Sequence, residues 1–341
     1  MSMEESKGVE VRRSISVVIP NYNGRNLLEE NLPSVFEALE VAAVAFEVIV
    51  VDDASTDESV DFLKTAFPQV ILLQNERNRG FSPTINRGIM AATKDLVLAL
   101  NSDVKLTPNY FLPLFKYFTK PDTFGVMGRI LDLDGKKVQD VAKYPQQKST
   151  GKIKSTIDFV LEPMPNDFWV PSLYLSGANA LVDREKIQEL GGFDEIYAPF
   201  YVEDVDLSVR AWRLGWSCYY EHEAVCHHPE SVTIANYHKK RKIYVISARN
   251  KLIMHALHLQ GVSKIVWNLK VFADFLMYWL ALNFRFYEAF FLFLRRFRQL
   301  RQSKKRMKQL LKKYNRKESI NTIIDRMRQQ IEAYNVVKLD I

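Results

Sequence analysis

The sequence contains little cysteine and no long apolar run. These two features argue against a disulfide-rich protein and against a protein with a membrane-spanning helix. Only Cys218 and Cys226 occur among 341 residues, so we expect two reduced thiols rather than a disulfide framework. The opening residues, MSMEESKGVEVRRS, lack the apolar core of a secretory signal, so the expected location is the cytoplasm. With 47% hydrophobic and 26% charged residues, the chain is predicted to fold as one domain of roughly 200–250 residues plus an appendage.

Acidic residues are absent from residues 295–317, where lysine and arginine are dense. The formal net charge is +7, and its uneven distribution implies an anionic partner, either nucleic acid or anionic lipid. The preceding residues 265–294 are rich in aromatic and aliphatic side chains, but charges interrupt them before they reach the ~20 apolar residues that a spanning helix needs. An apolar helix followed by a basic one is typical of an interfacial anchor. We therefore expect residues 265–317 to lie on an anionic membrane surface and not to bind nucleic acid; a buried helical hairpin with a solvated basic face is the alternative.

Strand-like and helix-like segments alternate through the first hundred residues, and no internal repeat is visible. The predicted strands are residues 16–20, 46–53, 70–73 and 95–100, and the predicted helices are residues 27–39 and a helix with Ser82 as N-cap and Pro83 as its first residue. This alternation predicts an α/β fold with a mostly parallel central sheet and helices on both faces. Ligands of such sheets bind beyond the carboxyl ends of the strands.

Acidic side chains follow these predicted strands. Asp52 and Asp53 end the second strand, and Asp103 comes after the fourth. We therefore expect a polar site along one edge of the sheet. The same residue type is also common in ordinary turns and helix caps, which is the alternative interpretation.

Six motifs occur in order between residues 14 and 235: SVVIPNYNG, VIVVDDAST, NRGFSPTINRGI, LVLALNSD, GGFDE and YVEDVDLSVRAWRLG. The ordered set resembles the family 2 glycosyltransferases of the GT-A fold, a Rossmann-like α/β architecture, and in particular bacterial rhamnosyltransferase-like enzymes of surface polysaccharides. The resemblance implies a flexible N-terminus at residues 1–13, a GT-A domain over 14–257, and amphipathic and basic helices over 258–341. It also implies inverting transfer of a sugar from a nucleoside-diphosphate sugar to a glycan or lipid-linked acceptor at a membrane surface.

The resemblance places the sugar nucleotide at the first strand ends and the loops beside them. The residues implied as donor ligands are Pro20, Asn21, Tyr22, Asp53, Arg79, Gly80, Asn86, Ser102 and Arg249. A carboxylate at position 53 can accept a hydrogen bond from a base N–H, a glycine at position 80 lets backbone approach the nucleotide, and a guanidinium can bind a diphosphate through two hydrogen bonds. The alternatives are a turn-capping Asp53, a surface Arg79 and an Arg249 on a helix surface.

Asn101-Ser102-Asp103 stands where the family carries a D-x-D metal motif, with asparagine in place of the first aspartate. The resemblance implies that Asp103 binds Mg²⁺ or Mn²⁺ and that His228 completes the metal site. Such a cation neutralises charge on a departing nucleoside diphosphate. Because the first aspartate is missing, an enzyme without a metal is the alternative.

The pair Glu203-Asp204 resembles the family's E-D motif at the start of a helix, which Gly215 is expected to end. The resemblance implies that Asp204 is the general base, with Glu203 beside it in the catalytic pair. A single displacement needs a carboxylate that takes the proton of the attacking hydroxyl. Acidic residues are also favoured in a first helical turn by the helix dipole, so their position alone does not establish catalysis.

Zinc binding is disfavoured, because Cys218, His222, Cys226 and His227 lack the close paired spacing of structural zinc sites. The alternation in CYYEHEAV predicts a strand there instead. Two other functions compete with sugar transfer. A sugar nucleotidyltransferase would need a glycine-rich loop after the first strand, where IPNYNGRNLL has a single glycine. A non-enzymatic membrane or nucleic-acid binder would act through the basic segment.

Overall fold

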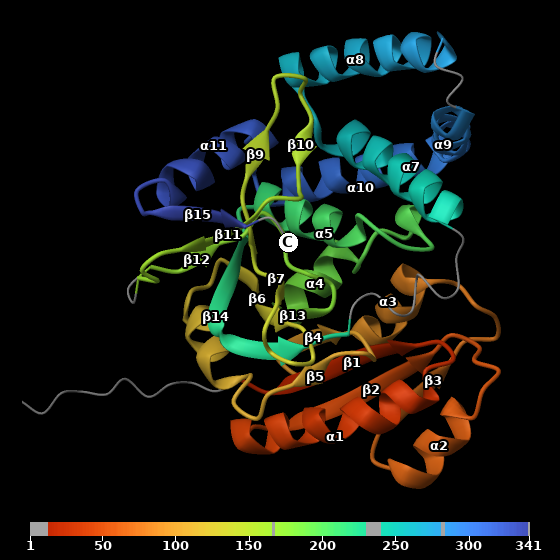
Figure 1. The fold of residues 1–341 in the computed structure, drawn as a ribbon, viewed down its shortest axis with the longest axis vertical. Helices are drawn as coiled ribbons and strands as arrows, with labels where there is room; N and C mark the ends of the chain where they lie inside the picture. Colours follow the sequence, from red (N-terminus) through yellow and green to blue (C-terminus); the bar gives the residue numbers. More distant parts are fainter. Residues whose placement is uncertain (1–12, 166–167, 230–239, 281–283, 340–341) are drawn as a thin grey trace, which may run out of the picture.

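The computed structural model describes residues 13–165, 168–229, 240–280 and 284–339. The expected flexible N-terminus therefore lies, except for Arg13, outside the described residues. The first part of the chain alternates strands and helices (Figure 1). Its elements are β1 (Ile15–Asn21), α1 (Arg25–Ala42), β2 (Phe46–Asp52), α2 (Ser59–Ala66), β3 (Ile71–Gln74), α3 (Phe81–Ala91), β4 (Leu96–Leu100) and β5 (Lys105–Leu106).

The four predicted strands are confirmed as β1 to β4, and the helix predicted over residues 27–39 is confirmed as α1. The predicted start of the next helix is wrong by a few residues. Helix α3 begins at Phe81 with Gly80 as its N-cap, so Ser82 and Pro83 lie inside its first turn. The reason is tertiary, because the Phe81 N–H donates to the Pro199 carbonyl at 3.1 Å and thereby fixes where the helix starts.

The middle of the chain is mainly extended. Its elements are the 3₁₀ helix η1 (Leu112–Thr119), β6 (Thr123–Leu131), β7 (Val138–Asp140), β8 (Ala142–Lys143), β9 (Gln146–Gln147), β10 (Ile153–Lys154), β11 (Asp158–Leu161), β12 (Val170–Pro171), β13 (Asn179–Asp183), α4 (Arg184–Leu190), the 3₁₀ helix η2 (Glu195–Tyr197), α5 (Glu203–Arg213) and β14 (Ser217–His227). The strand predicted from CYYEHEAV is thus confirmed, and it holds both cysteines as buried free thiols.

The central sheet has the order β12-β14-β6-β13-β4-β1-β2-β3. Strands β4, β1, β2 and β3 are parallel, whereas β13 runs antiparallel to both of its neighbours, β4 and β6. The sheet is therefore mixed. The expectation of a mostly parallel sheet is confirmed, because β6 and β14 are parallel to each other and run in the same direction as β1 to β4, whereas β13 and β12 run the opposite way. A sequence pattern shows that a strand is buried on both faces but not the direction in which it inserts between its neighbours.

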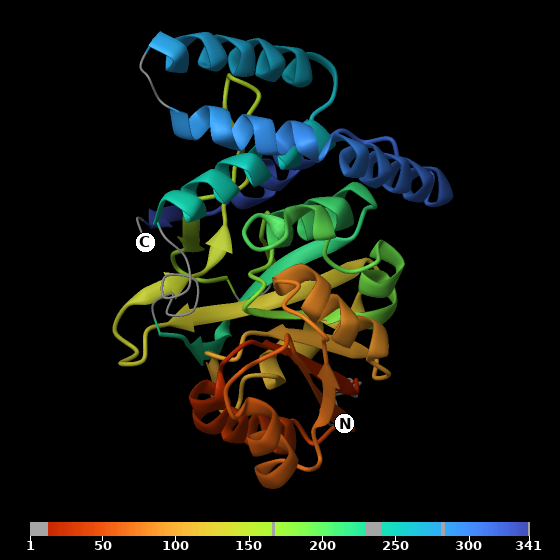
Figure 2. The same cartoon turned by 90° about the vertical axis from the view of Figure 1, so that its right-hand side faces the viewer.

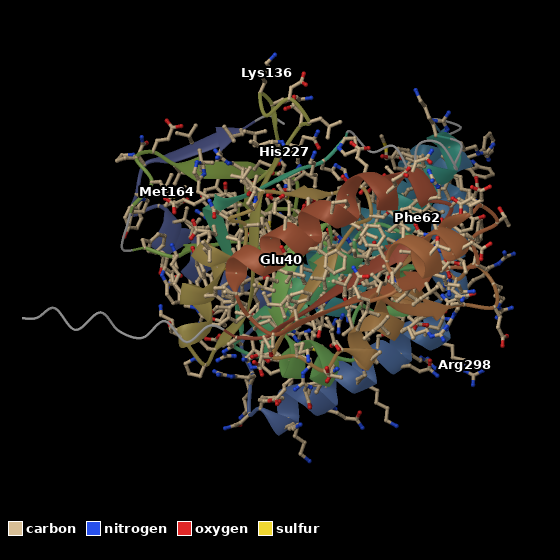
Figure 3. All side chains as sticks on the ribbon, turned by 90° about the horizontal axis from the view of Figure 1, so that it is seen from below. Glu40, Phe62, Lys136, Met164, His227 and Arg298 are labelled. Carbon is tan, nitrogen blue, oxygen red and sulfur yellow. The ribbon has the colours of Figure 1, made fainter. Side chains whose placement is uncertain are left out.

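Alternate residues of β1 point into two buried clusters, one on each face of the sheet. Val17 packs with residues of α1 and η1, and Val18 packs with residues of α3, α4 and α5. Figure 3 views the α1 and α2 side, where Glu40 lies on α1 and Phe62 on α2. Strands buried on both faces in this way match the apolar runs seen in the sequence.

The C-terminal part adds helices and one strand. These are α7 (Lys240–His258), α8 (Gly261–Leu280), α9 (Phe284–Arg295), α10 (Phe297–Lys313), α11 (Ile320–Ile331) and β15 (Val336–Leu339). Figures 1 and 2 show α8 at the end of the molecule opposite α1 and α2. No described helix is both long and apolar enough to cross a bilayer.

The C-terminal elements pack onto the earlier part of the chain. Met307 of α10 and Ile324 of α11 belong to the same buried cluster as α3 and α5. Strand β15 pairs antiparallel with β11, which also pairs with β8, so a small sheet joins the end of the chain to residues 142–161. The C-terminal segment, which the sequence predicts to be an appendage, thus shares a hydrophobic core with the main domain.

Candidate active site

A cleft of about 1770 Å³ opens where the carboxyl ends of β1, β2 and β4 face the start of α5 and the strand β7. It brings together three carboxylates that are far apart in the sequence, those of Asp53, Asp103 and Asp204. The predicted site residues that line it are Pro20, Asn21, Tyr22, Asp53, Gly80, Ser102, Asp103, Glu203, Asp204 and His228. Among the described residues the lining does not include Arg79, Asn86 or Arg249.

Asp53 organises the loop that precedes α3. Its carboxylate accepts hydrogen bonds from the backbone N–H groups of Arg79 and Gly80 and from the side-chain amide of Asn75, at 2.7 to 3.0 Å. The side chain is only 3% exposed. The turn-capping interpretation therefore describes what the carboxylate does in the protein itself, and its predicted contact with a base stays a prediction.

Gly80 and Asn86 connect the third motif to distant segments. A Cβ at Gly80, whose φ is +84°, would lie 3.0 Å from Pro199, so only glycine fits this approach. The Asn86 side chain pairs with both the N–H and the carbonyl of Phe193, each at 2.8 Å. Asn86 thus holds the GGFDE motif in place, and its predicted contact with a nucleotide stays a prediction. The Arg79 side chain lies about half exposed beside Glu195 at 3.6 Å.

The Asp103 Oδ1 lies 3.2 Å from the His228 Nε2, and both side chains line the cleft. One carboxylate oxygen and one imidazole nitrogen side by side fit a divalent cation such as Mn²⁺ or Mg²⁺, which commonly takes one or two protein ligands plus substrate phosphates. Within the described ranges no group of three or more His, Cys, Asp or Glu side chains could hold a metal ion. Asp103 and His228 would be two of the ligands, and donor oxygens and water would supply others.

Glu203 and Asp204 open α5 at the opposite wall. Burial, followed by the charge of the neighbouring Asp204, raises the pKa of Glu203. Burial also raises the pKa of Asp204, and the nearby carboxylate of Asp140 acts in the same direction. One Glu203 side-chain oxygen is buried with no hydrogen-bond partner among the described residues. A carboxylate with a raised pKa is a stronger base than an ordinary aspartate, as general-base chemistry near neutral pH needs.

The loop that presents this pair is strained and pinned. Tyr201 and Val202 have φ values of 72° and 75°, and a β-branched residue rarely adopts the left-handed region. The Asn250 side-chain amide donates to the carbonyls of Tyr197, Phe200 and Tyr201, each at 2.8 Å. These bonds hold a backbone that would otherwise relax.

Arg249 takes part in the same pinning. Its guanidinium donates to the carbonyls of Tyr197 and Ala198 at 3.0 and 2.8 Å, and the residue is 5% exposed. The predicted contact of Arg249 with a diphosphate stays a prediction. In this structure the residue fixes the loop before Glu203.

Sequence reasoning missed the contribution of β7 to the cleft. Gln139 donates to the His228 carbonyl at 2.8 Å and lies 3.2 Å from the His228 Nδ1, so it orients the imidazole beside Asp103. Its neighbour Asp140 lines the same cleft. No motif marks these residues, because their role depends on β7 pairing with β6 next to β14.

The mixed α/β sheet, with a cleft at the ends of its parallel strands, is the architecture of GT-A glycosyltransferases. The glycosyl transferase family 2 model matches residues 16–191, and the chain belongs to this family. The match spans the elements from β1 to α4.

Two relatives from Mycobacterium tuberculosis are similar along most of the chain. An N-acetylglucosaminyl-diphospho-decaprenol L-rhamnosyltransferase is 29% identical over 265 residues, which cover 68% of this chain and 83% of the relative. A pre-mycofactocin glycosyltransferase is 30% identical over 247 residues, covering 71% of this chain and 48% of the relative, so the chain spans about half of its length.

Solved structures share the architecture. GalNAc-T7 with UDP, GalNAc and Mn²⁺ superposes with a TM-score of 0.62 at 16% identity, covering 95% of this chain and 58% of that one. Staphylococcus aureus TarS 1-349 in complex with UDP-GlcNAc gives a TM-score of 0.50 at 18% identity, covering 74% and 69%. At such identities the likeness shows the fold alone.

Proposed function

We propose that this chain is an inverting glycosyltransferase that moves a sugar from a nucleoside-diphosphate sugar to a lipid-linked glycan at the cytoplasmic face of a membrane. The observation that carries the proposal is the meeting of Asp103 and Asp204 on facing walls of one cleft. A lipid-linked acceptor is supported by the relative that is named for a diphospho-decaprenol substrate.

The two walls of the cleft have different roles in the proposed reaction. Asp204 accepts the proton of the attacking hydroxyl, which adds to the anomeric carbon from the side opposite the leaving diphosphate and inverts its configuration. Asp103 and His228 would hold the divalent cation, which when bound neutralises charge on the leaving group. Asp53 and the β1 end contact the nucleoside, and the pinned loop of residues 197–202 keeps Asp204 in position.

The test is a panel of nucleoside-diphosphate sugars with Mn²⁺ or Mg²⁺, in which nucleoside diphosphate release is followed with and without a short-chain N-acetylglucosaminyl diphospholipid. The expected result is acceptor-dependent release of nucleoside diphosphate, with a product whose anomeric configuration, read by NMR, is opposite to that of the donor. Retention of configuration contradicts the inverting mechanism. Formation of a nucleoside-diphosphate sugar and inorganic pyrophosphate from a nucleoside triphosphate and a sugar 1-phosphate, without acceptor-dependent sugar transfer, indicates a sugar nucleotidyltransferase.

The membrane contact is proposed to be the outer face of α8. Large apolar side chains follow one another at intervals of three and four residues along it, and each is at least half exposed: Val262, Ile265, Leu269, Phe272, Leu276 and Trp279. Phe284 and Phe291 of α9 are also more than half exposed. Helices α8 and α9 do contact each other, through Phe275 and Tyr287 at 5.0 Å between ring centroids, but their outer faces remain open to solvent. An exposed apolar face of this extent is typical of a membrane or protein contact.

Lysines beside this face favour an anionic lipid surface as the partner. Lys152, on the turn between β9 and β10, and Lys270 of α8 both contact Asp274, at 3.9 and 2.5 Å. Burial lowers the pKa of Lys152, and the positive charges of Lys270, Lys148 and Lys251 act in the same direction. Several cations around one carboxylate create a local positive field that attracts phosphate headgroups.

The basic run of residues 295–317 contributes less than its composition suggests. Within α10, Arg306 donates to the Leu190 carbonyl at 3.0 Å and Lys313 pairs with Glu189 at 2.7 Å. The apolar side of the helix, including Met307 and Leu310, is buried against the main domain. The headgroup contact is therefore assigned mainly to the lysines next to α8.

Sedimentation with vesicles tests the proposed membrane face. We expect the wild-type protein to sediment with vesicles containing phosphatidylglycerol and to bind neutral phosphatidylcholine vesicles much less. Leu269→Glu with Phe272→Glu is expected to abolish binding, whereas Met90→Glu, at a residue that is 48% exposed on another surface, is the matched control. Unchanged vesicle binding of the double variant contradicts the assignment. Loss of a dimer in light scattering without an effect on vesicles indicates that a second copy covers this face.

A further inference from the structure

Strand β7 lies on the same side of the cleft as Asp204, opposite the ends of β1, β2 and β4. Gln139 and Asp140 are consecutive residues of this strand, and both line the cleft. Gln139 contacts His228 and so belongs to the proposed metal side. Asp140 has a different set of partners, which separates it from the donor machinery.

Asp140 forms an ion pair with a buried lysine. The Lys143 Nζ lies 2.5 Å from the Asp140 Oδ1 and also contacts the carboxylate of Asp158 on β11. The side chain of Lys143 is 7% exposed, whereas that of Asp140 is 19% exposed and lines the cleft. A carboxylate anchored in this way cannot swing away, so it presents a fixed hydrogen-bond acceptor to the cleft.

Lys143 stays charged between the two carboxylates. Burial by itself would lower the pKa of Lys143, but Asp140 and Asp158 outweigh this effect and raise it. Lys143 is therefore positive at neutral pH. The anchoring depends on the sheet β15-β11-β8, in which Asp158 is paired with Lys143 on one side and with Leu339 on the other.

Asp140 also lies within electrostatic range of the proposed base. Its negative charge raises the pKa of Asp204, and the positive charge of Lys143 lowers it. The only other carboxylates that line this part of the cleft, among the described residues, are Glu203 and Asp204 themselves. Asp53 and Asp103, in contrast, belong to the wall built by β1 to β4.

We propose that Asp140 binds a hydroxyl group of the acceptor sugar next to the hydroxyl that attacks the donor. This inference rests on the proposed function and adds a substrate-binding residue to it. An ionised carboxylate that only accepts hydrogen bonds matches a polyhydroxyl ligand, because each sugar hydroxyl can donate to it. Lys143 is the positioning residue, since it touches Asp140 and not the substrate.

The experiment compares Asp140→Asn with wild type on a short-chain N-acetylglucosaminyl diphospholipid and on its monodeoxy analogues. We expect Asp140→Asn to raise the acceptor KM by about 10- to 100-fold while leaving donor affinity unchanged, because a hydrogen bond to a charged group is lost. One deoxy analogue should lose a similar factor with wild type and little more with the variant. Lys136→Ala, on the exposed turn before β7 (Figure 3), is the control that should change nothing.

Two further readouts keep the test decisive. Asp140→Asn should move the acid limb of the kcat profile to lower pH, because a negative charge near Asp204 is removed, and Lys143→Met should move it to higher pH and also raise the acceptor KM. An unchanged acceptor KM in Asp140→Asn, or equal losses on every deoxy analogue in both proteins, overturns the inference alone. Absence of transfer by wild type to any acceptor overturns the proposed function as well.

Discussion

The two walls of the cleft are built in different ways. The donor wall comes from residues 20–103, where successive strand and helix units each contribute the side chains that follow a strand end. The facing wall comes from residues 130–242, and its groups are held by distant partners such as Asn250 and the β15-β11-β8 sheet. The donor wall can be predicted from local sequence. The facing wall depends on tertiary contacts between segments that are far apart in the chain.

The base on the facing wall gives the sharpest test of this division. Asp204→Asn is expected to lower the rate of sugar transfer by about 1000-fold, because an amide cannot accept the proton of the attacking hydroxyl. Donor affinity, measured by calorimetric titration, should stay within a factor of two. Asp134→Asn, on the exposed turn before β7, serves as control. An unchanged rate of sugar transfer in Asp204→Asn would contradict the assignment of Asp204 as the general base.

The complementary test is on the donor wall. Asp103→Ala is expected to weaken donor binding by about 100-fold, because several kcal/mol of charge neutralisation at the diphosphate are lost. Chelation of divalent cations should have the same effect on wild type and little further effect on the variant. Tight, metal-independent donor binding by Asp103→Ala would favour the alternative of an enzyme without a metal.

The pinned loop should affect transfer more than donor binding. Asn250→Ala removes three hydrogen bonds to carbonyls of residues 197–201, so we expect kcat to fall about 10-fold and the free energy of unfolding to fall by ~3 kcal/mol. Stopped-flow transfer assays and urea unfolding measure the two quantities. If Arg249→Lys instead weakens donor binding with kcat unchanged, the guanidinium contacts the diphosphate after all.

The pH dependence is the smallest expected effect. Burial and the nearby Asp140 raise the pKa of Asp204 to about 6, with Lys143 opposing, so transfer should fall as pH drops through about 6 rather than about 4. Glu203 has a raised pKa as well, and the buried phenol of Tyr174 is close by. The sign follows because the base works only when it has lost its proton. A kcat that stays flat down to pH 4.5 would contradict this environment.

Local sequence was enough for the strands and for most of the lining. The β-branched runs predicted β1 to β4, and residues directly after them, such as Asn21 and Asp53, do line the cleft. Local sequence was not enough for side chains that can form hydrogen bonds either to a ligand or to the protein backbone. Arg249 and Asn86 were expected at the nucleotide, but each is buried against the backbone of residues 193–198.

The sequence by itself determined the α/β class, the family and the identity of the carboxylates at the strand ends, because hydrophobic period and strand-end chemistry are properties of neighbouring residues. Only the tertiary structure decided the antiparallel insertion of β13, the strained loop before Glu203 and the anchoring of Asp140 by Lys143. The first two depend on contacts between segments that are far apart in the sequence. The third depends on which of several nearby carboxylates the Lys143 ammonium contacts. Such choices are settled by burial and sheet pairing, which appear only when the chain is folded.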